Sequence, residues 1–281
     1  MSQTPPPLSP KSDPGRRNGE LRSVNSAPRF GSLRTILALI LREMSTSYGR
    51  SPGGYLWAIL EPALAIGVMV AIFSTGFRSP RLGTNFPIFY ASGFLVYFCF
   101  SNPSIRVSQA VNFSKQLLAY PRVTFIDTII ARFLLSALTQ YLVAYILFLI
   151  ILNTMDTRTV LQIPYLVSAM AMASSLAIGI GTLNCVLISR FPLWQSVWSV
   201  ITRPLVLISG VIFIPESIPQ PYRDWLLWNP LVHAVSEGRK AFYPSYTADY
   251  ISHIYVYGLS LICLITGLAL LRRTFRDSLE R

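Results

Sequence analysis

The sequence has little charge, few histidines and few cysteines. Only 13% of its 281 residues are charged, whereas soluble domains carry about a quarter. The two histidines, His233 and His253, are too far apart in sequence to form a helical metal pair, and the three cysteines show no paired spacing. We therefore expect neither a metal site nor a disulfide framework, and we expect most of the chain to lie in lipid.

Motifs for nucleotide binding and for zinc-dependent hydrolysis are also absent from the sequence. No glycine is followed by lysine, so no GxxxxGK[ST] loop exists to cradle a phosphate, and HExxH does not occur. The aqueous loops hold few carboxylates, namely Asp127, Asp156, Glu216, Asp224, Glu237 and Asp249. They form no evident convergent set, so we expect that this chain is not an enzyme and binds no cofactor itself.

What the chain does have is hydrophobic residues and positive charge. It is 52% hydrophobic, with a mean hydropathy of +0.47, a net charge of +12 and a pI near 10.0. A basic pI can indicate nucleic-acid binding, but here the cations lie in the tails and loops of an apolar chain. The positive-inside rule explains them better, so we expect no nucleic-acid partner.

Apolar segments predict an all-α integral membrane protein with six transmembrane helices, each near the roughly 20 residues that a span needs. They are residues 56–77, 88–111, 129–152, 164–188, 193–214 and 255–271. Asn102-Pro103 is expected to break the second span. With the N-terminus inside, the inner loops and tails carry 16 lysines and arginines and the outer loops 6, which favours two cytoplasmic termini.

The region before the first span divides in two. Residues 1–31 are proline-rich and basic, which predicts a disordered tail, while residues 32–281 are expected to form the transmembrane domain. Residues 32–50 predict an amphipathic helix on the cytoplasmic interface, with Ser32 as its N-cap. Its apolar residues fall in a sector of about 140°, with Leu39 the exception.

Residues 52–62, PGGYLWAILEP, place the carboxylate of Glu61 and a proline at the start of the first span. A charge at that depth usually faces a protein interior or a water-filled path, so this segment indicates a conduit. Arg132 lies near the inner end of the third span and is expected to snorkel. Arg203 lies in mid-span, and pairing with Glu61 of the same or a neighbouring subunit is one option.

Two connections have patterns of their own. Between the last two spans, the sequence predicts a re-entrant or interfacial pair of short helices, the first from Pro221 and the second with Asn229 as N-cap and Pro230 at its first position. The inner connection 112–122 predicts a short helix that ends before Pro121. It is either an ordinary interfacial turn or a helix that docks in a groove of a soluble partner.

Aromatic residues recur along the second, third and fifth spans. Most are expected to pack in the core or lie at the membrane interface. A tyrosine-lined path would also suit a sugar polymer, because aromatic faces stack on sugar rings, but the pattern alone does not single out sugar. The substrate-path candidates are Trp57, Glu61, Tyr90, Tyr97, Phe98, Tyr141, Trp194, Trp198 and Arg203.

Two stretches resemble a known family. Residues 42–62, REMSTSYGRSPGGYLWAILEP, and the later NPLVH at 229–233 with RKAFYPSY at 239–246 are similar to the permeases of capsular polysaccharide ABC exporters. These permeases are of the KpsM type and are related to O-antigen permeases of the Wzm type. The resemblance covers about residues 33–275.

The resemblance implies a homodimer in the bacterial inner membrane, with two separate ATPase subunits that bind ATP and magnesium. It also implies a lipid-linked polysaccharide as substrate and further partners in the periplasm and outer membrane. By this resemblance the ATPase-coupling candidates are Lys115, Gln116, Leu117, Leu118, Tyr120, Arg122, Arg42 and Arg50. The periplasmic gate candidates are Tyr222, Trp225, Trp228, Asn229, Pro230 and His233.

Three hypotheses therefore stand at this point. The first is a permease that exports capsular or similar lipid-linked polysaccharide, the second is a permease of the same type for a lipid or drug, and the third is a membrane enzyme or scaffold without transport. Loss of surface polysaccharide on deletion would favour the first over the second. Co-purification with an ATPase would count against the third.

Overall fold

The computed structural model describes residues 31–47, 54–76, 79–116 and 123–279, and these are helical with short connections. The predicted tail at 1–30 lies outside the described residues. The helices are α1 (Gly31–Ser47), α2 (Gly54–Gly76), α3 (Phe86–Ser108), α4 (Ala110–Phe113), α5 (Phe125–Thr154), α6 (Ile163–Arg190), α7 (Leu193–Ile208), the 3₁₀ turn η1 (Pro215–Ser217), α8 (Tyr222–Leu226), α9 (Pro230–Lys240) and α10 (His253–Leu279).

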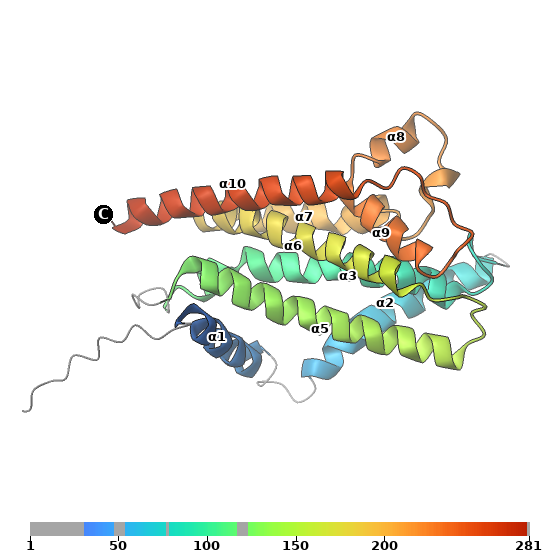
Figure 1. Ribbon diagram of the computed structural model, residues 1–281, viewed down its shortest axis with the longest axis horizontal. Coiled ribbons are helices and arrows are strands. Elements are labelled where there is room, and N and C mark those ends of the chain that lie inside the picture. Colours follow the sequence, from blue (N-terminus) through green and yellow to red (C-terminus); the bar gives the residue numbers. More distant parts are fainter. Residues whose placement is uncertain (1–30, 48–53, 77–78, 117–122, 280–281) are drawn as a thin grey trace, which may run out of the picture. The chain divides into compact units, whose positions relative to one another are not determined.

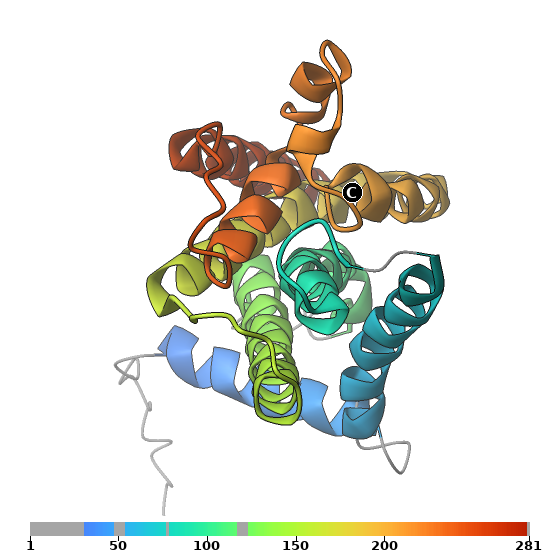
Figure 2. The same ribbon diagram turned by 90° about the vertical axis from the view of Figure 1, so that its right-hand side faces the viewer.

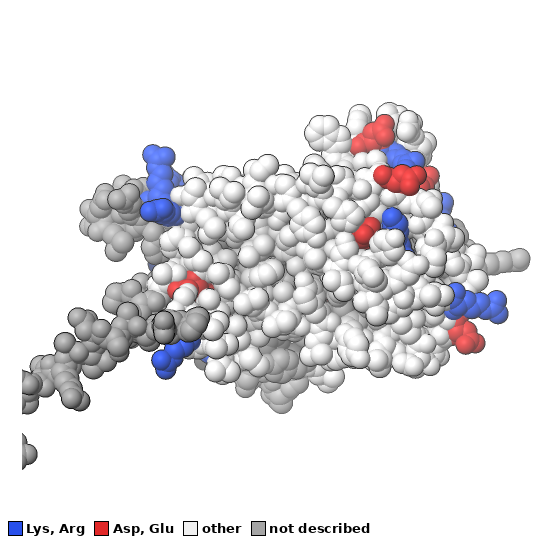
Figure 3. Space-filling model, viewed as in Figure 1, with Lys and Arg blue, Asp and Glu red and all other residues white. Residues whose placement is uncertain are grey.

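Five helices are long and apolar enough to cross a bilayer, namely α2, α3, α5, α6 and α10. On the face shown in Figure 3, charged residues lie near the two ends of the long helices and a band without them lies between. The α-helical membrane fold predicted from the sequence is therefore confirmed. The remaining predicted span, the fifth, corresponds to α7, whose 16 residues make it a shorter apolar helix.

The end of α7 corrects the predicted boundary of the fifth span. The helix stops at Ile208 instead of continuing to residue 214. Gly210 follows in the left-handed region with φ 72°, a conformation that glycine adopts easily after a helix end. A helix of 16 residues rises only about 24 Å, which is less than the roughly 30 Å of hydrocarbon.

The second span also differs from its prediction. Asn102-Pro103 was expected to break it, but α3 runs without interruption from Phe86 to Ser108 with Pro103 inside. Pro103 is buried, as is most of α3. Neighbouring helices can hold a transmembrane helix together across a proline, and here α5 and α6 both pack closely against α3.

Figure 1 shows α3, α5, α6 and α10 running side by side, with α1 and the C-terminal end of α10 at one end. The short elements η1, α8 and α9 lie at the opposite end. Viewed end-on in Figure 2, α1 crosses the direction of α5 instead of following it. We call these the α1 end and the α9 end.

Glycines on α6 allow close contacts between helices. A Cβ on Gly179 would overlap the backbone oxygen of Ser260 on α10, and a Cβ on Gly181 would lie 2.9 Å from Val107 Cβ on α3. Small residues are common at such contacts because lipid provides no hydrophobic force between helices, so close packing must hold them together. α6 therefore joins α3 to α10.

This contact gives a first prediction. We expect Gly179→Ala to lower the stability by about 1–3 kcal/mol because the added methyl group meets backbone instead of a flexible side chain. Thermal unfolding in detergent micelles measures the effect. The matched control is Gly67→Ala on α2, where a Cβ meets nothing within 4 Å, so stability should stay equal or rise. An equal change in thermal stability in the two variants would contradict this account of the packing.

Candidate functional site

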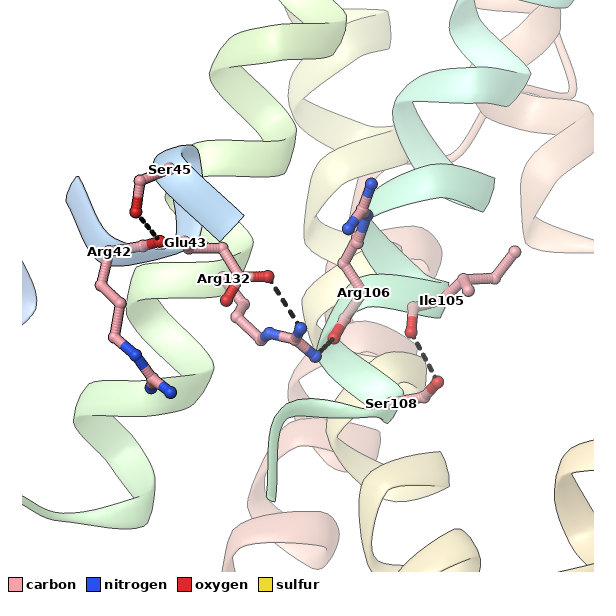
Figure 4. A network of polar contacts seen from close by, with 7 residues as sticks. All are labelled: Arg42, Glu43, Ser45, Ile105, Arg106, Ser108 and Arg132. Atoms are coloured by element: carbon pink, nitrogen blue, oxygen red, sulfur yellow. Dashed lines mark hydrogen bonds and ion pairs between the residues drawn. The ribbon is translucent and has the colours of Figure 1, made fainter. Parts of the chain in front are cut away.

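Arg132 is the centre of a polar cluster at the α1 end (Figure 4). Its guanidinium on α5 donates through Nη2 to Glu43 Oε1 of α1 at 2.7 Å and through Nη1 to the carbonyl oxygen of Arg106 on α3 at 3.1 Å. It also lies 4.1 Å from the ring centre of Phe113 on α4. One side chain therefore contacts four elements, counting its own helix.

The cluster corrects the prediction that Arg132 snorkels to water. Arg132 is 4% exposed and Glu43 is 8% exposed, and their ion pair holds the charges inside the protein. A buried ion pair adds little net stability, because desolvation offsets the attraction. Removing only one partner, however, costs about 3–5 kcal/mol, since the other charge is left uncompensated. The two groups are therefore strongly dependent on each other.

A second contact joins α1 to α5. Ser32 Oγ donates to Asp127 Oδ1 at 2.6 Å. Ser32 is the second residue of α1 and is not the N-cap predicted for this helix. Asp127 also belongs to the capping box of α5, where its Oδ2 accepts from the backbone N–H and the hydroxyl of Thr124. The start of α5 thus holds the start of α1.

At the α9 end, Arg239 has no exposed surface and binds backbone. Its two terminal nitrogens donate to the carbonyl oxygens of Phe213 at 2.7 Å and Val211 at 2.8 Å, and its guanidinium stacks over Phe89 at 4.5 Å. Burial lowers the pKa of Arg239, but arginine remains charged in proteins. The side chain fixes the turn after α7 against α3 and α9.

His233 ties α9 to both neighbouring connections. Its Nε2 donates to the carbonyl oxygen of Leu227 at 2.9 Å, while its Nδ1 accepts from the backbone N–H of Ser252 at 3.2 Å. Only the neutral ring can make both bonds. Burial, with a smaller contribution from His253, lowers the pKa of His233 below its ordinary value of 6.5.

This lowered pKa gives the second prediction. The folded protein binds fewer protons at His233 than the unfolded chain, so stability is retained above about pH 6.5 and falls below it. One such group changes the unfolding free energy by up to about 1.4 kcal/mol per pH unit. Thermal unfolding between about pH 8 and pH 5 should show the decline, and His233→Gln should weaken it. If the decline in stability persisted in His233→Gln and disappeared in His253→Gln, the decline would come from His253 and the prediction for His233 would be wrong.

The substrate-path candidates fall into two groups. Several make contacts inside the chain: Tyr97 donates to the Thr202 carbonyl oxygen at 3.1 Å, Tyr141 bonds Ser174 at 2.7 Å, and Trp194 donates to Asn184 at 2.8 Å. Tyr90 is buried, and Phe98 and Trp198 are half-buried. Trp57, Glu61 and Arg203 are exposed on α2 and α7.

Glu61 and Arg203 do not pair within one chain. Among the described residues the ion pairs are Arg132–Glu43 and His253–Glu237, and neither Glu61 nor Arg203 makes a hydrogen bond there. The option of pairing within one subunit is therefore wrong for this structure, while pairing between subunits remains a prediction. The indole N–H of Trp198 is buried and has no partner in the described part of the chain.

The coupling candidates are only partly described. Of the segment 112–122, where a short helix was predicted, the structure describes residues 112–116. There α4 ends at Phe113, and residues 114–116 form a turn in which Lys115 and Gln116 are exposed. Arg42 is exposed, and Figure 4 shows its side chain directed away from Arg132. The other candidates, Arg50, Leu117, Leu118, Tyr120 and Arg122, lie outside the described residues.

The gate candidates lie at the α9 end, where the two predicted short helices are confirmed as α8 and α9. Asn229 caps α9 by accepting from the Leu231 N–H, and Pro230 takes the first helical position. Tyr222, Trp225 and Trp228 are exposed, whereas His233 is buried with most of α9. Trp228 and His233 line an open pocket of about 340 Å³ together with Asp224, Leu227 and Tyr255.

Sequence reasoning missed the roles of Glu43, Asp127 and Arg239. A signal for Glu43 was present in the sequence, because Leu39 lies one turn before Glu43 and outside the apolar sector of α1. In the structure Leu39 is half-buried, as are Thr35 and Ile40. The Thr124–Asp127 spacing was a readable capping signal. Nothing in the sequence indicated that Arg239 binds backbone.

Comparison with known proteins adds the family relationship. Residues 34–243 match the ABC-2 type transporter family. The chain is 37% identical over 238 residues to the polysialic acid transport protein KpsM of Escherichia coli, covering 85% of this chain and 92% of the relative. It is also 30% identical over 243 residues to the capsule polysaccharide export inner-membrane protein CtrC of Neisseria meningitidis serogroup A, covering 85% and 91%. BexB of Haemophilus influenzae, with the same description, is 27% identical over 241 residues, covering 85% and 90%.

Proposed function

Because the chain belongs to the ABC-2 type transporter family, we propose that it is the transmembrane permease of an ATP-driven exporter of capsular or similar lipid-linked polysaccharide. It would act in the bacterial inner membrane. The observation that carries this proposal is the similarity, over nine-tenths or more of their length, to proteins named for capsule polysaccharide or polysialic acid transport. The multi-pass helical fold supports it.

ATP hydrolysis is assigned to a separate subunit, which would bind the ATP and magnesium. This chain has no phosphate-binding loop of the GxxxxGK[ST] type. Two copies of that ATPase would dock at the α1 end, on residues 112–122 and on α1. The excess of lysine and arginine in the loops of the α1 end supports a cytoplasmic position for this end. The α9 end would then face the periplasm and the further export partners.

A second copy of the chain would complete the path. None of the residues of α7 is buried, and α2 is the least buried of the five long spans. Glu61 and Arg203 are on these two helices, and both are exposed to the outside of the single chain. Charges in a membrane segment ordinarily face protein or water. A homodimer that encloses α2 and α7 around hydrated polymer would meet that requirement.

Deletion of the gene in its own host gives the third prediction. Because the permease is the only route for the finished polymer, we expect polysaccharide to accumulate inside the cell while surface polysaccharide is lost. Antibody or lectin staining before and after permeabilisation measures both pools. Restoring the wild-type gene should restore export, and a matched strain whose partner ATPase carries an inactive Walker lysine should resemble the deletion.

Two outcomes would contradict the proposal. Normal surface polysaccharide with changed sensitivity to drugs or detergents would favour a permease for a small lipid or drug. Absence of polymer in both pools would place the chain in synthesis or assembly instead of transport.

A further inference from the structure

We infer that the open pocket at the α9 end binds the headgroup of a membrane phospholipid that carries an organic ammonium group. The residues that line this pocket come from α8, α9, the segment between them and the start of α10, and they are Asp224, Leu227, Trp228, His233 and Tyr255. The pocket shares no residue with the substrate-path candidates, so the inference does not depend on the cargo. It includes two of the gate candidates, Trp228 and His233.

Three aromatic side chains form much of the pocket wall. The ring centres of His233 and Tyr255 lie 5.4 Å apart, with their planes inclined by 58°, and the Trp228 side chain is exposed. The Tyr255 hydroxyl donates to the Trp228 carbonyl oxygen at 2.6 Å, which ties the start of α10 to the segment between α8 and α9. Aromatic ring faces attract organic cations, and cages of such rings bind quaternary ammonium ligands. The wall therefore suits an ammonium group.

Asp224 gives the pocket a negative charge. Its carboxylate is exposed and makes no ion pair within the part of the chain that the structure describes. The neighbouring Arg223 does not line the pocket, because its guanidinium lies over the Tyr250 ring at 5.5 Å. His233 is neutral and uses both ring nitrogens in bonds to backbone groups, so it offers no donor to an anion. The pocket therefore favours a cationic ligand.

The position of the pocket indicates that a lipid carries this cation. Tyr255 is the third residue of α10, whose apolar stretch from His253 is long enough to cross a bilayer, so the pocket lies where a span begins. Trp225 and Ile254, at 69% and 88% exposure, flank the pocket residues in the sequence. Tryptophan and tyrosine are enriched at the level of the headgroups. Figures 1 and 2 both show α8 projecting from the side of the bundle at the α9 end.

The size and the side chains of the pocket argue against other ligands. Its volume of about 340 Å³ is near the lower limit of small-molecule sites, which span roughly 300–1,000 Å³, so it holds a headgroup and not a stretch of polymer. A metal ion needs several oxygen or nitrogen ligands, and no group of three or more metal-binding side chains occurs among the residues that the structure describes. The acyl chains of a bound lipid would lie outside the pocket, along α10.

The fourth prediction tests this site on the purified full-length chain in detergent micelles. Short-chain phosphatidylethanolamine is titrated while thermal unfolding is followed, and phosphatidylglycerol with the same acyl chains serves as the lipid without an ammonium group. We expect the ethanolamine lipid to raise the unfolding temperature with saturation, because a ligand that binds only the folded state stabilises it. Asp224→Asn and Trp228→Leu should each raise its half-saturating concentration roughly tenfold. The response to phosphatidylglycerol should be the same in wild type and variants.

Asp156→Asn and Trp225→Leu are the matched controls, since each removes an exposed side chain of the same type outside the pocket and should leave the half-saturating concentration unchanged. Unfolding without lipid gives each variant its own baseline, so a loss of stability is separated from a loss of binding. An unchanged response to the ethanolamine lipid in both pocket variants would overturn the inference. Equal stabilisation by free ethanolamine at the same concentration would also contradict it and would indicate a site for a soluble amine.

Discussion

Close contact of α6 with α3 and α10 is the constraint on which the rest of this structure depends. At Gly179 and Gly181 the helices approach so closely that a single added carbon has no room. Since lipid provides no hydrophobic force to hold helices together, such packing must do it. The helices that bear the candidate functional residues, α1, α2, α5 and α7, are arranged around this centre.

The few charged side chains in the apolar part of the chain have three kinds of surroundings. Arg132 is buried with a carboxylate, and Arg239 is buried with backbone carbonyl groups. Glu61 and Arg203 have neither kind of partner within the described residues and lie on the outside of α2 and α7. The first two charges hold the fold together, whereas the last two need a partner that the described residues do not supply. This difference is the physical reason to propose a second copy and a hydrated path.

The two ends of the molecule differ in how they are held. At the α1 end, polar side chains join separate helices to one another, with Arg132 and Asp127 on α5 as the fixed points. At the α9 end, Arg239 and His233 bind backbone groups of the connections between helices, and Asn229 caps α9 through the backbone N–H of Leu231. The first arrangement suits transmission of movement between helices. The second suits a rigid frame around the exposed aromatic residues of α8 and Trp228.

Local sequence signals predicted the helices and the capping of α9 by Asn229 well, because apolar length and capping chemistry depend on neighbouring residues alone. These signals failed where contacts between residues far apart in the sequence determine the structure. Pro103 does not break α3 because α5 and α6 pack against it, and Arg132 does not snorkel because Glu43, 89 residues earlier, reaches it. Gly210, two residues after the end of α7, was a local signal for that end, but the apolar run to residue 214 concealed it.

The central claim is that α2 and α7 face an enclosed aqueous path and not lipid. Single cysteines at Glu61 and Arg203 test it, in a background whose Cys99, Cys185 and Cys263 are replaced by alanine. Membrane vesicles of both orientations holding the complete complex would be treated with a charged, water-soluble thiol reagent, with Leu138→Cys on the exposed face of α5 as the lipid control. The account predicts reaction at 61 and 203 and little at 138. Equal protection at all three positions would contradict it.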